Sequence, residues 1–256
     1  MDVSPLGLPF GRPHIEVLRL REDRASIQRQ VEDLFRLEDE AATELLLIRH
    51  AEPACNDVSN DDPLLSCTGL EQAERLGERL SSLWFDAIYA APERRAQQTA
   101  RLLSDATDSE VATVEDLREI EYMPAAPQPW ALPSPEFTAR HHDAPSTAER
   151  FMTKPRWDAL PGFAPSRCFR QRVLQGIELL VTKHPARRIA VVTHSSVINA
   201  YLSALLAIPQ DVFFAPQHTS ISCVRSLGEL FAVRTLNDTA HLLGQETPRP
   251  RLAKGR

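Results

Sequence analysis

Two histidines follow short apolar runs in this chain, and the first has an arginine beside it. The run at 45–48 ends in Arg49-His50, and the run at 189–192 leads through a threonine to His194. A continuous apolar run of this kind is typical of a strand buried on both faces of a parallel sheet, and ligands bind beyond the carboxyl ends of such strands. We therefore expect the three side chains at one rim of a sheet, where they suit an anion such as phosphate.

These residue types could cleave a phosphate ester. The cleavage can proceed in two steps through a phosphorylated side chain, and a neutral imidazole can attack phosphorus in line. His50 stands at a strand end, where the adjacent backbone can fix the tautomer of its ring. Arginine forks match the oxygens over which charge spreads during phosphoryl transfer. A purely structural histidine is the alternative for His50 and for His194.

The elements that would position these residues alternate along the chain. Short apolar runs take turns with amphipathic stretches, which predicts an α/β fold of three layers, with helices on both faces of a mostly parallel central sheet. Two further runs around a Leu-Gly pair predict a hairpin near the C-terminus. The expected strands are 44–49, 86–90, 111–114 and 188–193, the helices are 69–80, 93–103, 169–183 and 197–206, and the hairpin strands are 220–225 and 229–234.

The first 43 residues form an addition before the first sheet strand. We expect a loose arm, a short strand at 14–20 and a helix at 27–41 that Ser26 caps. The helix carries an apolar stripe at i, i+4, i+7 and i+8. This stripe can pack on its own domain or on a second subunit, so a homodimer through the N-terminal extension stays open.

Two later segments also depart from the alternation. Residues 124–165 hold nine of the twenty prolines, and a long irregular stretch inside an α/β domain is usually a functional lid. Residues 241–256 end in a basic, proline-rich sequence and are expected to be disordered. The main domain is therefore predicted over 44–240, with the lid as an insertion.

Composition limits the function classes. The net charge of −6 argues against a nucleic-acid or membrane-surface partner. No apolar run approaches the roughly 20 residues that span a bilayer, and the N-terminus lacks the basic and apolar regions of a signal peptide. The cysteines are few and show neither C-x-x-C nor metal-ligand spacing, which suits a reducing compartment. We expect a cytoplasmic protein that acts on a small molecule; its cysteines are Cys55, Cys67, Cys168 and Cys223.

Five segments in order resemble the motifs of the histidine phosphatase superfamily, the phosphoglycerate-mutase-like enzymes. Residues 47–53 resemble the R-H-G-E signature, and 65–73 match L-[ST]-x-x-G-x-x-Q-A. Residues 89–100 match Y-x-S-P-x-x-R-A-x-Q-T-A, and 117–120 match the acid-bearing L-x-E-[IL]. Residues 191–194 match the strand that delivers the second histidine. The resemblance implies a phosphoglycerate-mutase-like fold.

The resemblance also implies roles for single residues. His50 would be the phosphohistidine nucleophile, with Arg49, Arg95 and His194 as phosphate ligands. Arg94 is an unlikely substitute for its neighbour, because a shift of one residue on a helix turns the side chain by about 100°. Glu119 would be the acid that protonates the leaving group and later activates water.

The acid and Ser195 keep alternatives, and Asn56 is a further contact that the resemblance implies. Glu121 and Glu52 are rivals of Glu119 for the acid. Asn56, six residues after the nucleophile, would touch the phosphate or the substrate. Ser195 begins a strand-to-helix turn where backbone N–H groups can meet an anion, although its hydroxyl serves equally well as a helix cap.

The departures from the family pattern favour one activity. Ala51 and Ser195 replace glycines and stay small, but Ile120 and the residues after it lack the aromatic-glycine run of the mutases. We expect a metal- and cofactor-independent phosphohydrolase, with a phosphoglycerate mutase or a catalytically silent phosphate-binding module as alternatives. A silent module predicts loss of a charged site residue, and none is missing. A serine hydrolase lacks its G-x-S-x-G elbow, and the pair His141-His142 is more typical of a surface loop than of a metal site.

Overall fold

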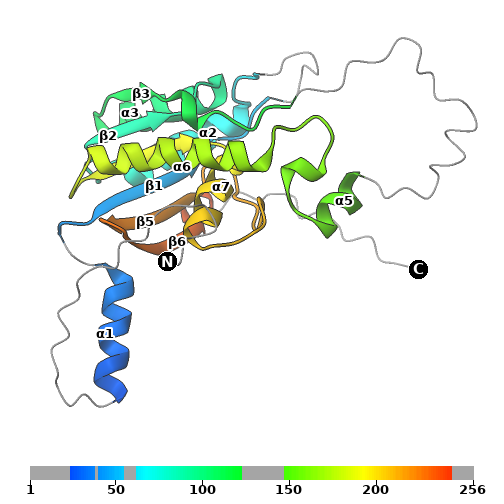
Figure 1. The fold of residues 1–256 in the computed structure, drawn as a ribbon. Helices are drawn as coiled ribbons and strands as arrows, with labels where there is room; N and C mark the ends of the chain where they lie inside the picture. The colour runs from blue at the N-terminus through cyan, green and yellow to red at the C-terminus, as the bar shows by residue number, and fades with distance from the viewer. Residues whose placement is uncertain (1–23, 38–39, 55–61, 123–146, 244–256) are drawn as a thin grey trace, which may run out of the picture.

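The computed structural model describes residues 24–37, 40–54, 62–122 and 147–243, which are built around a sheet of six strands (Figure 1). The strand order is β3-β2-β4-β1-β5-β6. The first four strands of this order are parallel, and β5 and β6 form an antiparallel hairpin that joins the sheet along β1. The mostly parallel sheet and the hairpin are confirmed. The strands are β1 (Thr43–Arg49), β2 (Ala87–Ala90), β3 (Val111–Thr113), β4 (Arg188–Thr193), β5 (Ile221–Leu227) and β6 (Leu230–Asp238).

The register of β1 and β4 determines where the two histidines lie. The two strands are parallel neighbours, and Arg49 pairs with Thr193. The next residues of each strand, His50 and His194, therefore leave the sheet side by side. The backbone N–H of His50 donates to the carbonyl of Thr193 at 2.8 Å, which extends the ladder one residue past the strand end and fixes the backbone under the first histidine.

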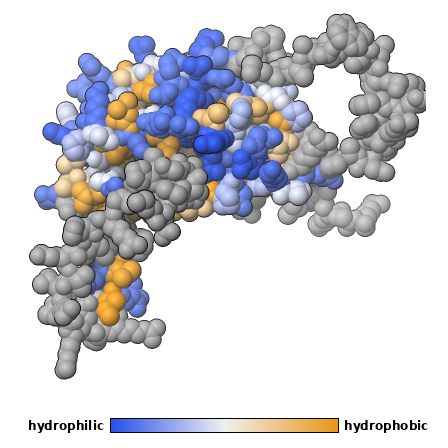
Figure 2. All heavy atoms as spheres, viewed as in Figure 1, coloured by the Kyte–Doolittle hydropathy of each residue, from blue (hydrophilic) through white to orange (hydrophobic). Residues whose placement is uncertain are grey.

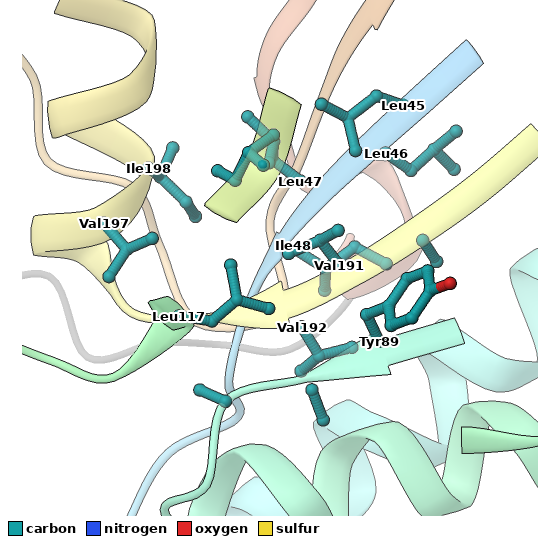
Figure 3. Close-up of a cluster of buried hydrophobic side chains, with 14 of the residues drawn as sticks. Leu45, Leu46, Leu47, Ile48, Tyr89, Leu117, Val191, Val192, Val197 and Ile198 are labelled. Atoms are coloured by element: carbon teal, nitrogen blue, oxygen red, sulfur yellow. The ribbon is translucent and has the colours of Figure 1, made fainter. Parts of the chain in front are cut away.

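Four helices cover the two faces of the sheet and form the three predicted layers. Helices α2 and α3 pack against each other on one face, and α6 and α7 pack against each other on the opposite face (Figure 1). In Figure 3, Val197 and Ile198 of α7 approach the strands that carry Leu47 and Val191. These four side chains are fully buried, and each contributes about 1.5–3 kcal/mol to folding. The helices are α2 (Cys67–Leu80), α3 (Arg94–Thr107), α6 (Ser166–Lys183) and α7 (Ser195–Leu205).

The N-terminal helix differs from the prediction at both ends. Helix α1 (Arg24–Arg36) begins before Ser26, so the prediction that Ser26 caps it is wrong. It projects from the domain beside β6 (Figure 1), and hydrophobic residues line part of it in Figure 2. Ile27 and Val31 remain 49% and 45% exposed. The predicted strand at 14–20 lies outside the described residues, and a homodimer stays a prediction.

The described part of the predicted lid is joined to the segment that follows Glu119. It contains α5 (Thr147–Thr153) and a 3-10 turn η2 (Trp157–Ala159). Tyr122 forms an isolated β-bridge with Phe163, and their rings pack at a tilt with centroids 4.9 Å apart. Trp157 stacks on Phe163 with ring centroids 5.1 Å apart. Residues 123–146, with the pair His141-His142, and the tail from 244 lie outside the described residues. That this segment covers the site stays a prediction.

Among the helices of the described ranges, none combines the length and the apolar character that a membrane crossing requires.

The loop after His50 rests on the first turn of α2, and Gly69 makes this contact possible. A Cβ on Gly69 would lie 2.1 Å from the backbone carbonyl oxygen of Glu52. Gln72 accepts the Glu52 backbone N–H at 3.0 Å, and the Ser66 hydroxyl donates to the Glu52 carboxylate at 2.8 Å. Ser66 also caps α2 by accepting the N–H of Gly69.

Gly69→Ala is therefore expected to destabilise the protein although alanine is the better helix former. The added Cβ must displace backbone, and overpacking of this kind costs about 1–3 kcal/mol. The free energy of unfolding in urea measures it. Gly77→Ala is the matched control in the same helix and should cost less, because its Cβ would meet Ala106 Cβ at 3.0 Å and the Leu102 carbonyl oxygen at 3.2 Å, and no part of the loop. Equal stability of the two variants would contradict the prediction.

Candidate active site

His50 is buried, and one of its two ring nitrogens lies within hydrogen-bond distance of a backbone carbonyl. Its Nδ1 lies 2.8 Å from the carbonyl oxygen of Ala51. A carbonyl only accepts, so Nδ1 carries the proton and the lone pair is on Nε2. Burial, followed by the neighbouring charge of His194, lowers the pKa of His50 well below its usual value. The ring is therefore neutral at pH 7 and can act as a nucleophile through Nε2.

Arg95 and His194 lie next to His50 and are both buried. The His50 and His194 ring centroids are 5.1 Å apart. Arg95 stands in the first turn of α3, and its Nη2 lies 3.4 Å from His194 Nδ1. The structure places Arg94 on the exposed side of the same turn, where its backbone N–H donates to both carboxylate oxygens of Asp62 at 2.9 and 3.0 Å. Of the two arginines, Arg95 is the one beside the histidines.

The guanidinium of Arg49 is held by one hydrogen bond and keeps a second, buried donor that has no partner among the described residues. Its Nη1 donates to the carbonyl of Pro216 at 2.7 Å, which holds the side chain. Its Nε is buried, and among the described residues it has no hydrogen-bond partner. Burial lowers the pKa of Arg49 from its ordinary value. A buried donor of this kind costs free energy unless a ligand accepts from it, and an anion beside His50 would do so.

Glu119 takes the place between the two cationic ligands. Its Oε2 lies 2.5 Å from Arg95 Nη2 and 3.6 Å from His194 Nδ1, and its side chain is 40% exposed. An oxygen atom in this position accepts from the donors that a phosphate oxygen would use. Glu119 follows a 3-10 turn, η1 (Glu115–Leu117). Its exposed carboxylate thus lies where an anion could contact Arg95 and His194.

The two rival carboxylates are placed elsewhere. Glu52 accepts the hydroxyl of Ser66 at the start of α2. The Glu121 carboxylate is 54% exposed and lies 3.8 Å from Arg118. Within the described ranges, neither carboxylate forms a hydrogen bond or an ion pair with His50 or His194, so the geometry favours Glu119 as the acid.

Glu93 is a site residue that the sequence analysis missed. Its Oε2 lies 2.7 Å from His194 Nε2, and its Oε1 accepts the backbone N–H of Glu119 at 3.0 Å. Burial alone would raise the pKa of Glu93, but the hydrogen bond and the charge of His194 outweigh it and hold the pKa at about 2. A signal was present, because Glu93 stands where β2 gives way to α3, at the same rim as the histidines.

His218 is the second missed residue. Its ring lies 5.6 Å from the His50 ring, and burial, followed by the charge of Arg49, lowers its pKa to about 4. The turn that carries it is bonded to Arg49, whose carbonyl accepts the N–H of Thr219 at 3.0 Å. Thr219 adopts φ 56°, a conformation that a β-branched residue rarely takes. A single loop residue gives no periodicity, so no sequence signal pointed to His218.

Two predicted substrate contacts remain, Asn56 and Ser195, and the structure describes only the second. Asn56 lies outside the described residues. Ser195 is the first residue of α7, and His194 takes the N-cap position. Ser195 is therefore not the N-cap of α7, and the predicted alternative is wrong. A contact of Ser195 with the substrate stays a prediction.

The buried histidines predict how stability depends on pH. The pKa values of His218 and His241 fall from 6.5 to about 4, through burial in both, helped at His241 by Arg79, and that of His50 falls well below 6.5. The unfolded chain therefore binds more protons than the folded chain between pH 6.5 and 4, so the free energy of unfolding should fall as the pH falls through this window.

Urea unfolding at pH 7, 6, 5 and 4 measures this dependence. His218→Gln and His241→Gln should each flatten the slope, because glutamine does not titrate. A free energy of unfolding that stays constant or rises between pH 6.5 and 4 would contradict the assignment.

The site and the fold can now be compared with known proteins. The family described as the histidine phosphatase superfamily (branch 1) matches residues 45–239. Phosphoserine phosphatase 1 of Hydrogenobacter thermophilus is 28% identical over 204 residues, which cover 77% of this chain and 93% of that protein. The adenosylcobalamin/alpha-ribazole phosphatase of Escherichia coli is 29% identical and covers 66% of this chain and 82% of its own length.

A solved structure shares the fold at lower identity. The phosphoglycerate mutase of Bacillus anthracis superposes with a TM-score of 0.63 at 16% identity, covering 78% of this chain and 95% of that structure. The likeness shows the fold, which is phosphoglycerate-mutase-like as predicted.

The match over well over half of the chain shows the class of protein: this chain belongs to the histidine phosphatase superfamily. Its named relatives are phosphatases, so it is a hydrolase of that family, and this prediction is confirmed.

Proposed function

We propose that this chain hydrolyses a small phosphomonoester through a phosphohistidine on Nε2 of His50. One observation carries the proposal. The bond from His50 Nδ1 to the Ala51 carbonyl leaves the Nε2 lone pair of a neutral, buried ring. That ring lies among Arg49, Arg95 and His194, which supply the positive charge that a phosphoryl group in transfer requires.

The reaction follows from these contacts. The phosphate oxygens bind the two arginines and His194, and they take the place of the Glu119 carboxylate. His50 Nε2 attacks phosphorus, the bond from phosphorus to the ester oxygen breaks, and its electron pair stays on the leaving oxygen. Glu119, protonated beside the anion, gives that oxygen its proton. Water then attacks phosphorus, Glu119 takes a proton from the water, and the bond to nitrogen breaks to return His50 and release phosphate.

The substrate class is inferred from the relatives and from the charge of the chain. Both reported relatives carry the names of phosphatases for small phosphorylated compounds, phosphoserine and alpha-ribazole. The net charge of −6 does not favour a nucleic acid. We infer a small phosphorylated metabolite as substrate and the cytoplasm as the place of action. No observation favours a mutase, because the run after Glu119 lacks the aromatic-glycine pair of those enzymes.

Phosphate release from a panel of phosphomonoesters tests the proposal. The assay is run at neutral pH with a chelator present, and a second sample with radiolabelled ester is quenched in alkali. We expect metal-independent release and a labelled protein whose label survives alkali and is lost in acid, as phosphohistidine is. No release from any ester, or a label that is stable in acid, would overturn the proposal.

A further inference from the structure

The carboxylate of Glu93 contacts both the second histidine and the segment that carries the proposed acid. Glu93 contacts His194 through one oxygen and the backbone of Glu119 through the other. We propose that Glu93 is a positioning residue, which aims Nδ1 of His194 at the phosphate and fixes the backbone of the acid. The inference rests on the proposed function and assigns it a residue beyond those that touch phosphate.

The local structure shows that the Glu93 side chain is not needed by its helix. Glu93 is the N-cap residue of α3, and its carbonyl accepts the N–H groups of Ala96 and Gln97, both at 3.0 Å. An N-cap side chain usually accepts a backbone N–H of the first turn, but that of Glu93 makes no such bond. Asp62 accepts the N–H of Arg94 instead. The N-terminus of α3 is thus capped from a distant loop, and the Glu93 carboxylate is left for the site.

The two bonds of Glu93 fix which nitrogen of His194 meets the phosphate. The Glu93 side chain is 16% exposed and that of His194 is fully buried, so little water competes for either bond. The carboxylate is ionised and only accepts, hence His194 Nε2 carries a proton. The other nitrogen, Nδ1, then faces Arg95 and Glu119 at 3.4 and 3.6 Å, which is the position assigned to the phosphate.

The charges around His194 explain why a carboxylate is needed behind it. Arg95 and His50 face the ring on its pocket side, together with Glu119. When phosphate displaces Glu119 from Arg95, His194 loses its 3.6 Å contact with that carboxylate and keeps the 2.7 Å contact with Glu93. Glu93 stays in place behind the ring and stabilises the protonated imidazole that donates to the phosphate. A second carboxylate thus allows Glu119 to leave its position and act as the acid.

Glu93→Gln is the sharpest substitution, because it keeps the shape. An amide has one acceptor oxygen and one donor nitrogen, so it satisfies either His194 Nε2–H or the Glu119 N–H and opposes the other. Carboxylates behind metal-ligating histidines contribute about 10- to 100-fold to affinity or activity. We expect a loss of similar size here in kcat/KM for aryl phosphates and in the affinity for orthovanadate, which binds as a phosphate analogue. Glu115→Gln changes an exposed carboxylate of the 3-10 turn before Glu119 that pairs with Arg118, and it should change neither.

A double-mutant cycle separates positioning from a general structural role. If Glu93 acts through His194, then Glu93→Gln should weaken vanadate binding far less in a His194→Gln background than in the wild type. Full additivity of the two losses, or a Glu93→Gln variant with wild-type vanadate affinity and kcat/KM, would overturn the inference. If Glu93→Gln fails to fold, Glu93→Asp is used, whose shorter side chain cannot span both partners; unchanged vanadate affinity of that variant also overturns it.

The outcomes distinguish this inference from the proposed function. Wild-type protein that binds orthovanadate but releases no phosphate from any ester would overturn the hydrolysis, and the vanadate affinities of the variants would still decide the role of Glu93. Wild-type protein that turns over esters, with no effect of Glu93→Gln, would leave the hydrolysis standing and remove Glu93 from it.

Discussion

His50→Ala is expected to abolish turnover while the protein stays folded. The substitution removes the only nitrogen that the proposed mechanism phosphorylates, and loss of a nucleophile typically costs on the order of 10⁴-fold or more in kcat. The fold should persist, because the backbone bond from His50 to Thr193 does not involve the ring. Phosphate release, the alkali-stable label and the far-ultraviolet circular dichroism spectrum are measured together.

The control for His50→Ala is a partly buried imidazole. His241→Ala removes a ring that accepts from Arg79 and contacts the hydroxyl of Thr219, without a ring contact to His50 among the described residues. This variant should keep most of the activity and should incorporate the label. Normal turnover by a folded His50→Ala variant would refute the phosphohistidine mechanism. Loss of activity in His241→Ala equal to that in His50→Ala would show that the assay reports folding instead of chemistry.

The fold could be predicted because its signals are local. The runs at 45–48 and 189–192 are apolar on both faces, and only a central strand buries both faces of such a run. The two strands were then found to be neighbours with Arg49 opposite Thr193. The helix boundaries were less accurate. Helix α1 is not capped by Ser26, since it begins at Arg24, and α6 begins at Ser166, directly after Pro165, rather than at 169.

The site was predictable only where residues follow strand ends or motifs. Arg49, His50 and His194 were placed together by the strands alone, and the motif comparison added Arg95 and Glu119. Two further residues at the site were missed, although one of them also follows a strand end.

Glu93 and His218 illustrate why. The first acts through bonds to residues 26 and 101 positions away, and the second lies on a turn whose place is set by Arg49. The strand end indicated where Glu93 lies, but the contacts of both residues are products of tertiary packing, so local patterns in a single sequence do not predict them.

Glu119→Gln is expected to slow the release of poor leaving groups much more than that of good ones. An alkyl alkoxide needs a proton as it departs, whereas a nitrophenolate is stable without one. General acid catalysis contributes about 10²- to 10⁴-fold where the proton is needed. We therefore expect a loss of that size in kcat/KM for an alkyl phosphate and a loss smaller by at least about tenfold for p-nitrophenyl phosphate.

Glu119→Gln has a second consequence, which follows from the place that its carboxylate occupies. Oε2 of Glu119 lies 2.5 Å from Arg95 and must give way to phosphate. A neutral amide interacts more weakly with the guanidinium, so orthovanadate and inorganic phosphate should bind the variant at least as tightly as the wild type. A weakened acid together with an undiminished anion site is a combination that general misfolding does not produce.

Glu121→Gln and Glu52→Gln are the matched tests of the rival acids. Glu121 is exposed beside Arg118, and Glu52 is bonded to Ser66, so neither should show the dependence on the leaving group. Equal slowing of alkyl and aryl esters by Glu119→Gln would remove the acid role from this residue. If the dependence then appeared in one of the other two variants, that carboxylate would have to reach the leaving oxygen from its present position. Since Glu119 alone of the three contacts Arg95 and approaches His194 in the phosphate-free site, we expect the dependence on the leaving group in that variant only.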